Sequence, residues 1–100
     1  MNNIKILIAD DHSMVREGLK QLIELEDDIE VIDQAGDGSE AIQKIVEGNP
    51  DVVLLDINMP RMNGLEVIKY LNENNIPTKT LILTIHNEVE YLYKAFEIGV

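Results

Sequence analysis

Four polar side chains of this sequence stand at the ends of short hydrophobic runs. They are Asp10, Asp11, Asp56 and Thr84. Three carboxylates that meet at one place cannot all stay ionised without a counter-ion, because like charges raise a pKa or recruit a cation. Carboxylate oxygens with open positions suit a hard divalent cation, Mg²⁺ or Mn²⁺. The pattern predicts a divalent-metal site if the fold brings these runs side by side.

Asp56 has the most demanding position of the four. The preceding run, Val52 to Leu55, is apolar at every residue, so an unpaired charge at its tip would be costly. A carboxylate can act as a nucleophile on phosphorus, and a metal beside it would neutralise charge on the phosphoryl group and on the acceptor. Thr84 would donate a hydrogen bond to a phosphoryl oxygen. These residues favour reversible phosphorylation of Asp56, with Mg²⁺ held by Asp11, Asp56 and a main-chain carbonyl of the following loop.

Single residues of this set also have ordinary structural interpretations. Acids near a helix start are favoured by its dipole, a strand-end Asp can cap a turn, and β-branched residues commonly end strands. His12 and His86 are more often polar loop residues than ligands. Met59 and Met62 are more often packing or contact residues. The grouping of the acids on separate strand ends is what favours the metal site.

The hydrophobic pattern predicts strands and helices in strict alternation, without a linker or repeat. Strands are predicted at Ile4 to Ala9, Ile29 to Ala35, Val52 to Leu55 and Thr80 to Thr84. Helices are predicted at Met14 to Leu25, from Leu65 to about Asn74, and after Asn87 as far as Gly99. A further helix is predicted to begin with a cap formed by Asp37 and Glu40 and to end at about Glu47. The stretch Ile57 to Gly64 is predicted to be a loop.

This order predicts one α/β domain with an open, doubly wound parallel sheet of the flavodoxin-like kind. Function in such sheets lies at the carboxyl ends of the strands. In the strand order 2-1-3-4-5 the first and third strands are neighbours, which places Asp10 and Asp11 within roughly 5 Å of Asp56 laterally. The alternating pattern of Ile29 to Ala35 indicates an edge strand.

The composition argues against several classes of function. The chain has 19 acidic and 8 basic residues and a formal charge of -11, which would repel the phosphates of DNA or RNA. It has no Cys, which excludes disulfides, thiolate metal sites and cysteine nucleophiles. Its apolar runs are far too short to span a bilayer and there is no signal peptide, so we expect a cytoplasmic protein without a membrane contact.

Three segments together closely resemble the receiver domain of two-component response regulators. They are Asp10-Asp11, Asp56 to Gly64, and Leu83-Thr84. The stretches IADDHSMVREGLKQLI and LTIHNEVEYLYKAFEIG are most similar to the NarL/FixJ subfamily of transcription regulators. The resemblance covers the whole chain, and the full set of residues is specific where the acidic pair alone would be weak.

The resemblance implies a role for each matched residue. Asp56 would accept a phosphoryl group from a phosphohistidine on a sensor histidine kinase. Asp10 and Asp11 would bind Mg²⁺, with Asp11 the more direct ligand, and Asn58 would contribute its main-chain carbonyl. Thr84 would be the switch hydroxyl that moves toward the phosphoryl group and changes a protein-binding surface.

Other matched positions would shape the acceptor loop and the lifetime of the phosphoryl group. Pro60 and Gly64 match the loop beyond the acceptor, with Gly64 providing backbone freedom. Asn58 and His86 are candidates for tuning the rate of phosphate loss. Ile85 stands where the family often has a smaller residue, and we expect it to narrow access to the acceptor and slow that loss.

In the family, the chain continues with a fifth strand, which bears a lysine. A switch aromatic residue and a fifth helix also belong to this continuation. We therefore expect a C-terminally incomplete receiver with four of the usual five strand-helix units and impaired switching. An uncovered edge at Thr80 to Thr84 would favour a homo-oligomer or a strand-exchanged dimer. DNA would be bound only through a domain outside this chain.

Three other functions stay open on the sequence alone. A Mg²⁺-dependent phosphatase also forms an aspartyl phosphate, but it usually needs a second acid where this chain has Asn58. A flavodoxin-like cofactor binder is disfavoured, because acids after the first strand would repel a flavin phosphate. A phosphate-independent adaptor would use the fold without the chemistry. We expect a signalling domain without independent substrate turnover rather than an enzyme.

Overall fold

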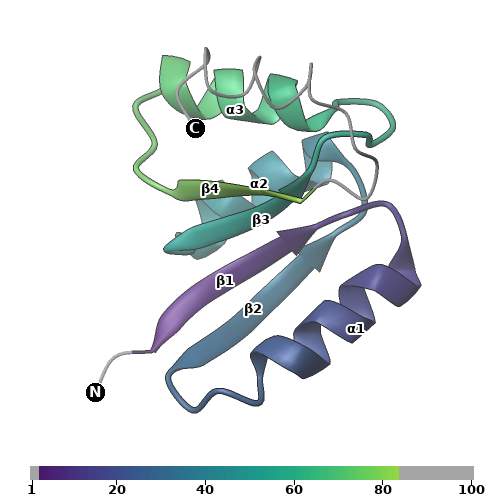
Figure 1. Cartoon of the computed structure of the whole chain (residues 1–100). Coiled ribbons are helices and arrows are strands. Elements are labelled where there is room, and N and C mark those ends of the chain that lie inside the picture. Colours follow the sequence, from purple (N-terminus) through teal and green to yellow (C-terminus); the bar gives the residue numbers. More distant parts are fainter. Residues whose placement is uncertain (1–2, 84–100) are drawn as a thin grey trace.

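The computed structural model describes residues 3–83, which form a four-stranded parallel sheet with helices on both faces (Figure 1). The strands are β1 (Ile4–Ala9), β2 (Ile29–Ala35), β3 (Val52–Asp56) and β4 (Lys79–Leu83). The helices are α1 (Ser13–Ile23), α2 (Gly38–Gly48) and α3 (Gly64–Glu73). The sheet order β2-β1-β3-β4 confirms the predicted flavodoxin-like α/β fold.

The two faces of the sheet carry separate hydrophobic clusters, and the alternation of side chains along β1 explains why. Leu7 and Ala9 point into the larger cluster, which α2 and α3 complete with Ala41, Ile45, Val67, Ile68 and Leu71. Ile6 and Ile8 point to the opposite face, where α1 covers them with Leu19 and Ile23. β1 is therefore buried on both sides, as a central strand of a parallel sheet must be.

The boundaries of most predicted elements agree with the structure to within a residue or two. β2 lies at one edge of the sheet as its alternating pattern predicts, and only Ala35 of its residues is fully buried. α1 ends at Ile23, two residues earlier than predicted. Leu25 is 76% exposed, so it adds nothing to the apolar face that would extend the helix.

The helix caps were only partly foreseen. The predicted cap of α2 is present, since Asp37 Oδ1 accepts a 2.8 Å hydrogen bond from the Glu40 amide. The Glu40 carboxylate reaches one residue further back than a capping box requires and accepts from the Gly36 amide at 2.6 Å. α3 has a complete capping box between Asn63 and Glu66, which the sequence analysis missed.

Several predictions fall on residues 84–100, outside the described part of the chain. They include Thr84, Ile85, His86 and the helix expected after Asn87. The oligomer expected from an uncovered β4 edge also stays a prediction. Within residues 3–83, no helix is long and apolar enough to cross a membrane.

Gly64 is needed for a reason other than the one we predicted. Its φ does not lie in the left-handed region, so backbone freedom is not what the position requires. A Cβ at this residue would lie 2.5 Å from the carbonyl oxygen of Asp56 and 2.8 Å from Ile57 Cα. The start of α3 is thus pressed against the end of β3, and the Gly64 amide donates to the Ile57 carbonyl at 2.9 Å.

Replacing Gly64 with Ala should therefore destabilise the domain by about 1–3 kcal/mol or more, because the new methyl group overlaps a backbone carbonyl. Gly18→Ala is the matched control: no atom lies within 4 Å of a Cβ at this α1 position. We expect that control to stabilise the domain by about 0.5–1 kcal/mol. Urea unfolding followed by circular dichroism measures both, and equal midpoints for the two variants would contradict the steric explanation.

Candidate metal centre

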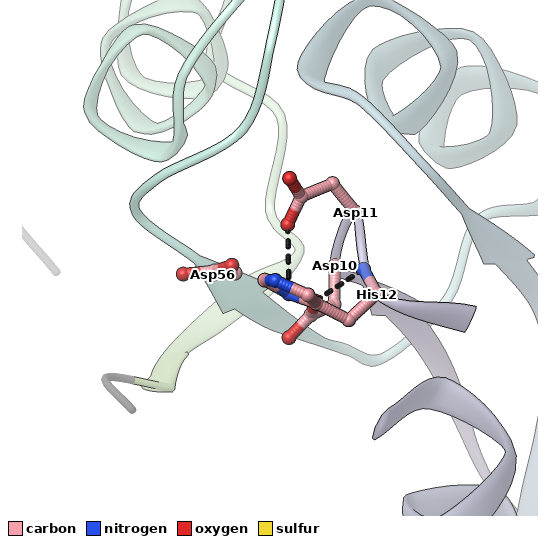
Figure 2. A group of neighbouring side chains, drawn as sticks. All are labelled: Asp10, Asp11, His12 and Asp56. Atoms are coloured by element: carbon pink, nitrogen blue, oxygen red, sulfur yellow. Dashed lines mark hydrogen bonds and ion pairs between the residues drawn. The ribbon is translucent and has the colours of Figure 1, made fainter. Parts of the chain in front are cut away.

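The carboxyl ends of β1 and β3 bring Asp10, Asp11 and Asp56 together, as the sequence predicts (Figure 2). Ala9 is paired with Leu55 in the sheet, so the residues that follow them come side by side. Donor atoms of the three acids and of His12 all lie within 4.8 Å of one another. The predicted grouping is confirmed, and it joins side chains from segments more than forty residues apart in sequence.

Asp10 is fully buried, and the chain pairs all but one of its polar atoms. Its amide donates to the Ala35 carbonyl of β2 at 3.0 Å. Its Oδ1 accepts from the His12 amide at 2.8 Å and lies 2.9 Å from the His12 ring. Its Oδ2 is buried without a hydrogen-bond partner in the described part of the chain. Such an orphaned carboxylate oxygen is costly, and a bound cation would satisfy it.

Asp56 is 5% exposed, and its Oδ1 accepts from the Asn58 amide at 3.1 Å. Burial raises the pKa of the Asp56 carboxyl above its ordinary value of 3.8. The Asn58 amide opposes this rise by stabilising the carboxylate, whereas the charges of Asp10 and Asp11 add to it. The site is therefore built so that the ionised form of Asp56 needs a positive partner.

His12 is a member of the cluster that the sequence analysis left out. The sequence favours a polar loop residue at this position, and His12 does lie at the N-cap of α1 with an exposed side chain. Its Nδ1, however, is 2.9 Å from both Asp10 Oδ1 and Asp11 Oδ1. The hydrogen bond to Asp10, followed by the charge of Asp11, raises the pKa of the imidazole above 6.5. Its position directly after two acids was the available signal.

The loop after Asp56 is anchored from two sides. Ile57 and Met59 are buried, and Met62 packs against the core, which confirms the packing role predicted for the methionines. Arg61 adopts a left-handed φ of 64°, and its Nε donates to Asp37 Oδ2 at 3.2 Å. At the start of α2, Gly38 lies so close to the Met62 backbone that a Cβ would not fit. The loop therefore has a defined path beside the acids.

The donor set fits a hard divalent cation such as Mg²⁺ or Mn²⁺. Three carboxylates converge, and one of them presents a buried oxygen that nothing else in residues 3–83 pairs. The side chain of Asn58 is exposed, and the contribution of its main-chain carbonyl stays a prediction. The arrangement can hold a cation next to a buried, hydrogen-bonded carboxylate.

Comparisons with known proteins show which family this chain is similar to. The family model of the response regulator receiver domain matches residues 6–100. Over 98 residues the chain is 39% identical to the transcriptional regulatory protein DegU of Brevibacillus brevis, covering 98% of this chain and 42% of that protein. Over 97 residues it is 42% identical to the oxygen regulatory protein NreC of Staphylococcus carnosus, covering 96% and 45%. The chain thus spans less than half the length of these curated relatives.

Solved structures show the same fold. The signal receiver domain of the putative response regulator NarL from Mycobacterium tuberculosis superposes with a TM-score of 0.95 at 32% identity, over 100% of this chain and 81% of that one. A LuxR-family DNA-binding response regulator from Staphylococcus aureus gives a TM-score of 0.91 at 37% identity, over 97% and 81%.

The raised pKa of Asp56 predicts how its removal changes stability. A carboxyl whose pKa is raised by folding contributes stability below its unfolded pKa, and this contribution is lost as the pH rises through the folded-state pKa. In EDTA at pH 7, Asp56→Asn should therefore be more stable than the wild type by about 1–3 kcal/mol. Below about pH 3 this difference in the free energy of unfolding should disappear, because the Asp56 carboxyl is then protonated in both the folded and the unfolded wild type.

Asp33→Asn is the control with the opposite sign. The amide of Gln34, followed by Lys44, lowers the pKa of the exposed Asp33 carboxyl, so its contribution is present above the ordinary value of 3.8 and is lost in acid. This variant should lose less than about 1 kcal/mol at pH 7. Urea titrations at pH 7 and in acid measure both, and an Asp56→Asn variant less stable than the wild type at pH 7 would contradict the prediction.

Proposed function

The chain belongs to the receiver-domain family of response regulators, and from this premise we propose that Asp56 accepts a phosphoryl group while Asp10 and Asp11 hold Mg²⁺. The observation that carries the proposal is the buried Asp56 carboxylate, within 4.8 Å of the other acids at the ends of adjacent strands. Receiver domains are the signalling domains of two-component systems. The donor would be a phosphohistidine of a sensor histidine kinase.

The geometry of the described residues supports a role for Asp56 and its neighbours. The Asn58 amide holds Asp56 Oδ1, which leaves Oδ2 without a hydrogen bond from the described part of the chain. Oδ2 would attack phosphorus, forming a P–O bond while the P–N bond to the donor imidazole breaks, and the released imidazole would keep its electron pair and take up a proton. Mg²⁺, held by Asp10, Asp11, Asp56 and the main-chain carbonyl of Asn58, would neutralise charge on the phosphoryl group and the acceptor.

Thr84 would donate to a phosphoryl oxygen and act as the switch hydroxyl, and Ile85 and His86 would tune phosphate loss.

The output of the switch would be control of transcription in the cytoplasm. The relative DegU is named a transcriptional regulatory protein, and NreC is named an oxygen regulatory protein. The Staphylococcus aureus structure is named a DNA-binding response regulator. A charge of -11 makes direct contact of this domain with DNA unfavourable. DNA would therefore be bound by a separate domain, whose activity this receiver domain controls through a protein contact.

Incubation with acetyl phosphate and Mg²⁺ tests the acceptor. We expect intact-mass spectrometry to detect one added phosphoryl group, which is lost in EDTA and absent from Asp56→Asn. Asp27→Asn is the matched control, since it removes an exposed carboxylate from the turn before β2, away from the cluster. That variant should be phosphorylated like the wild type.

Three results would overturn parts of this proposal. An adduct that persists in Asp56→Asn would assign the phosphoryl group to another residue. Consumption of acetyl phosphate without an adduct would favour a phosphatase. Cation binding without either reaction would favour a phosphate-independent adaptor.

A further inference from the structure

Arg16 links three elements around the acid cluster. It lies in the first turns of α1, and its guanidinium reaches back toward the sheet. Its Nη1 donates to the main-chain carbonyl of Asp10 at 2.5 Å, and its Nε donates to Gln34 Oε1 of β2 at 3.1 Å. One planar side chain therefore joins α1, the end of β1 and the edge strand.

The carbonyl that Arg16 holds has structural importance beyond Asp10 itself. Asp10 is fully buried, so its carbonyl requires a partner. No strand within residues 3–83 supplies one, because β1 ends at Ala9. This carbonyl belongs to the rigid peptide plane that joins Asp10 to Asp11. With the Asp10 amide bonded to Ala35 and the carbonyl bonded to Arg16, the backbone is fixed on both sides of the Asp10 Cα. That plane helps to set the direction in which the Cα–Cβ bonds of Asp10 and Asp11 leave the backbone.

Gln34, the second acceptor of the Arg16 guanidinium, is held in place as well. The Gln34 amide donates to Asp33 Oδ1 at 2.8 Å, and Lys44 of α2 donates to the Gln34 carbonyl. Gln34 is therefore tied to both β2 and α2, and it fixes the guanidinium plane through Arg16 Nε. An ammonium group in place of the guanidinium could not span both acceptors in this fixed geometry.

We propose that Arg16 is a positioning residue of the metal site, which orients the Asp10 and Asp11 carboxylates toward the cation by fixing the peptide plane between them. The inference rests on the proposed function, because it concerns the same site. It also explains how Asp10 can keep Oδ2 unpaired and in place: every other polar atom of the residue is fastened, to Ala35, His12 or Arg16.

The test is direct binding of Mn²⁺ to the full chain at pH 7, measured by electron paramagnetic resonance without a phosphoryl donor. We expect Arg16→Gln and Arg16→Lys each to weaken binding at least about tenfold, the usual effect of removing a group that orients a metal ligand. Lys20→Gln is the matched control, because it removes the same charge from the same helix without touching the cluster. It should bind Mn²⁺ like the wild type.

A second control separates positioning from stability. Ile23→Ala removes packing between α1 and the cluster of Ile6 and Ile8, so it should lower the urea midpoint while leaving Mn²⁺ affinity unchanged in the folded protein. Equal loss of affinity in Ile23→Ala and Arg16→Gln at similar stability would show that Arg16 acts through stability alone. Wild-type affinity in Arg16→Lys would show that the charge suffices. Either result would overturn the positioning role.

Failure of the inference differs from failure of the proposed function. If the wild type and Arg16→Gln bind Mn²⁺ equally well, the positioning role of Arg16 is refuted and the metal site stays intact. If the wild type does not bind Mn²⁺ at millimolar concentration, both the metal site and the positioning role are refuted. Amide chemical shifts of Asp11 and His12 in EDTA give an independent readout: they should move in both Arg16 variants and stay unchanged in Lys20→Gln.

Discussion

The repulsion among three carboxylates at the ends of β1 and β3 is the constraint on which the rest of this structure depends. Hydrophobic burial of both strands forces the acids together, because Ala9 and Leu55 are paired and fully buried. The fold thus places charge where it is least stable. The surrounding residues limit this cost: the His12 ring lies between Asp10 and Asp11, and the Asn58 amide binds Asp56. Among residues 3–83, one buried side-chain oxygen stays unpaired, Asp10 Oδ2.

The loops beside the cluster are held in place by contacts that have no room for variation. The start of α3 lies against the Asp56 carbonyl at Gly64, and the start of α2 lies against Met62 at Gly38. The Asp37–Arg61 ion pair joins the same two regions. Because a cation site requires its ligands within a few tenths of an ångström, such steric contacts serve it better than flexible surface ion pairs. The close-packed glycines and the acids are parts of one arrangement.

The sequence predicts the fold and the acid cluster well because both follow from periodicity. Alternation along β1 assigns Ile6 and Leu7 to opposite faces, and the ends of apolar runs locate the carboxylates. The predictions fail where a contact depends on the direction of one side chain. His12 and Arg16 both reach back from α1 toward Asp10, and nothing in the hydrophobic pattern distinguishes them from solvent-exposed polar residues. Backbone freedom is the wrong explanation for Gly64, because its close approach to the Asp56 carbonyl is a tertiary contact that the local sequence does not reveal.

The electrostatics of the site also explain why the proposed phosphoryl acceptance by Asp56 should depend on a cation. A phosphoryl donor is an anion, and it would approach a chain of charge -11 at a point where three carboxylates converge. His12 can neutralise only part of that charge, and its exposed side chain weakens its effect. The Arg16 guanidinium donates to the main-chain carbonyl of Asp10 and to Gln34 Oε1, so it is held by these two acceptors and not by a carboxylate of the cluster. The described residues therefore supply too little positive charge to admit an anion, and the buried Asp10 oxygen marks where the missing charge belongs.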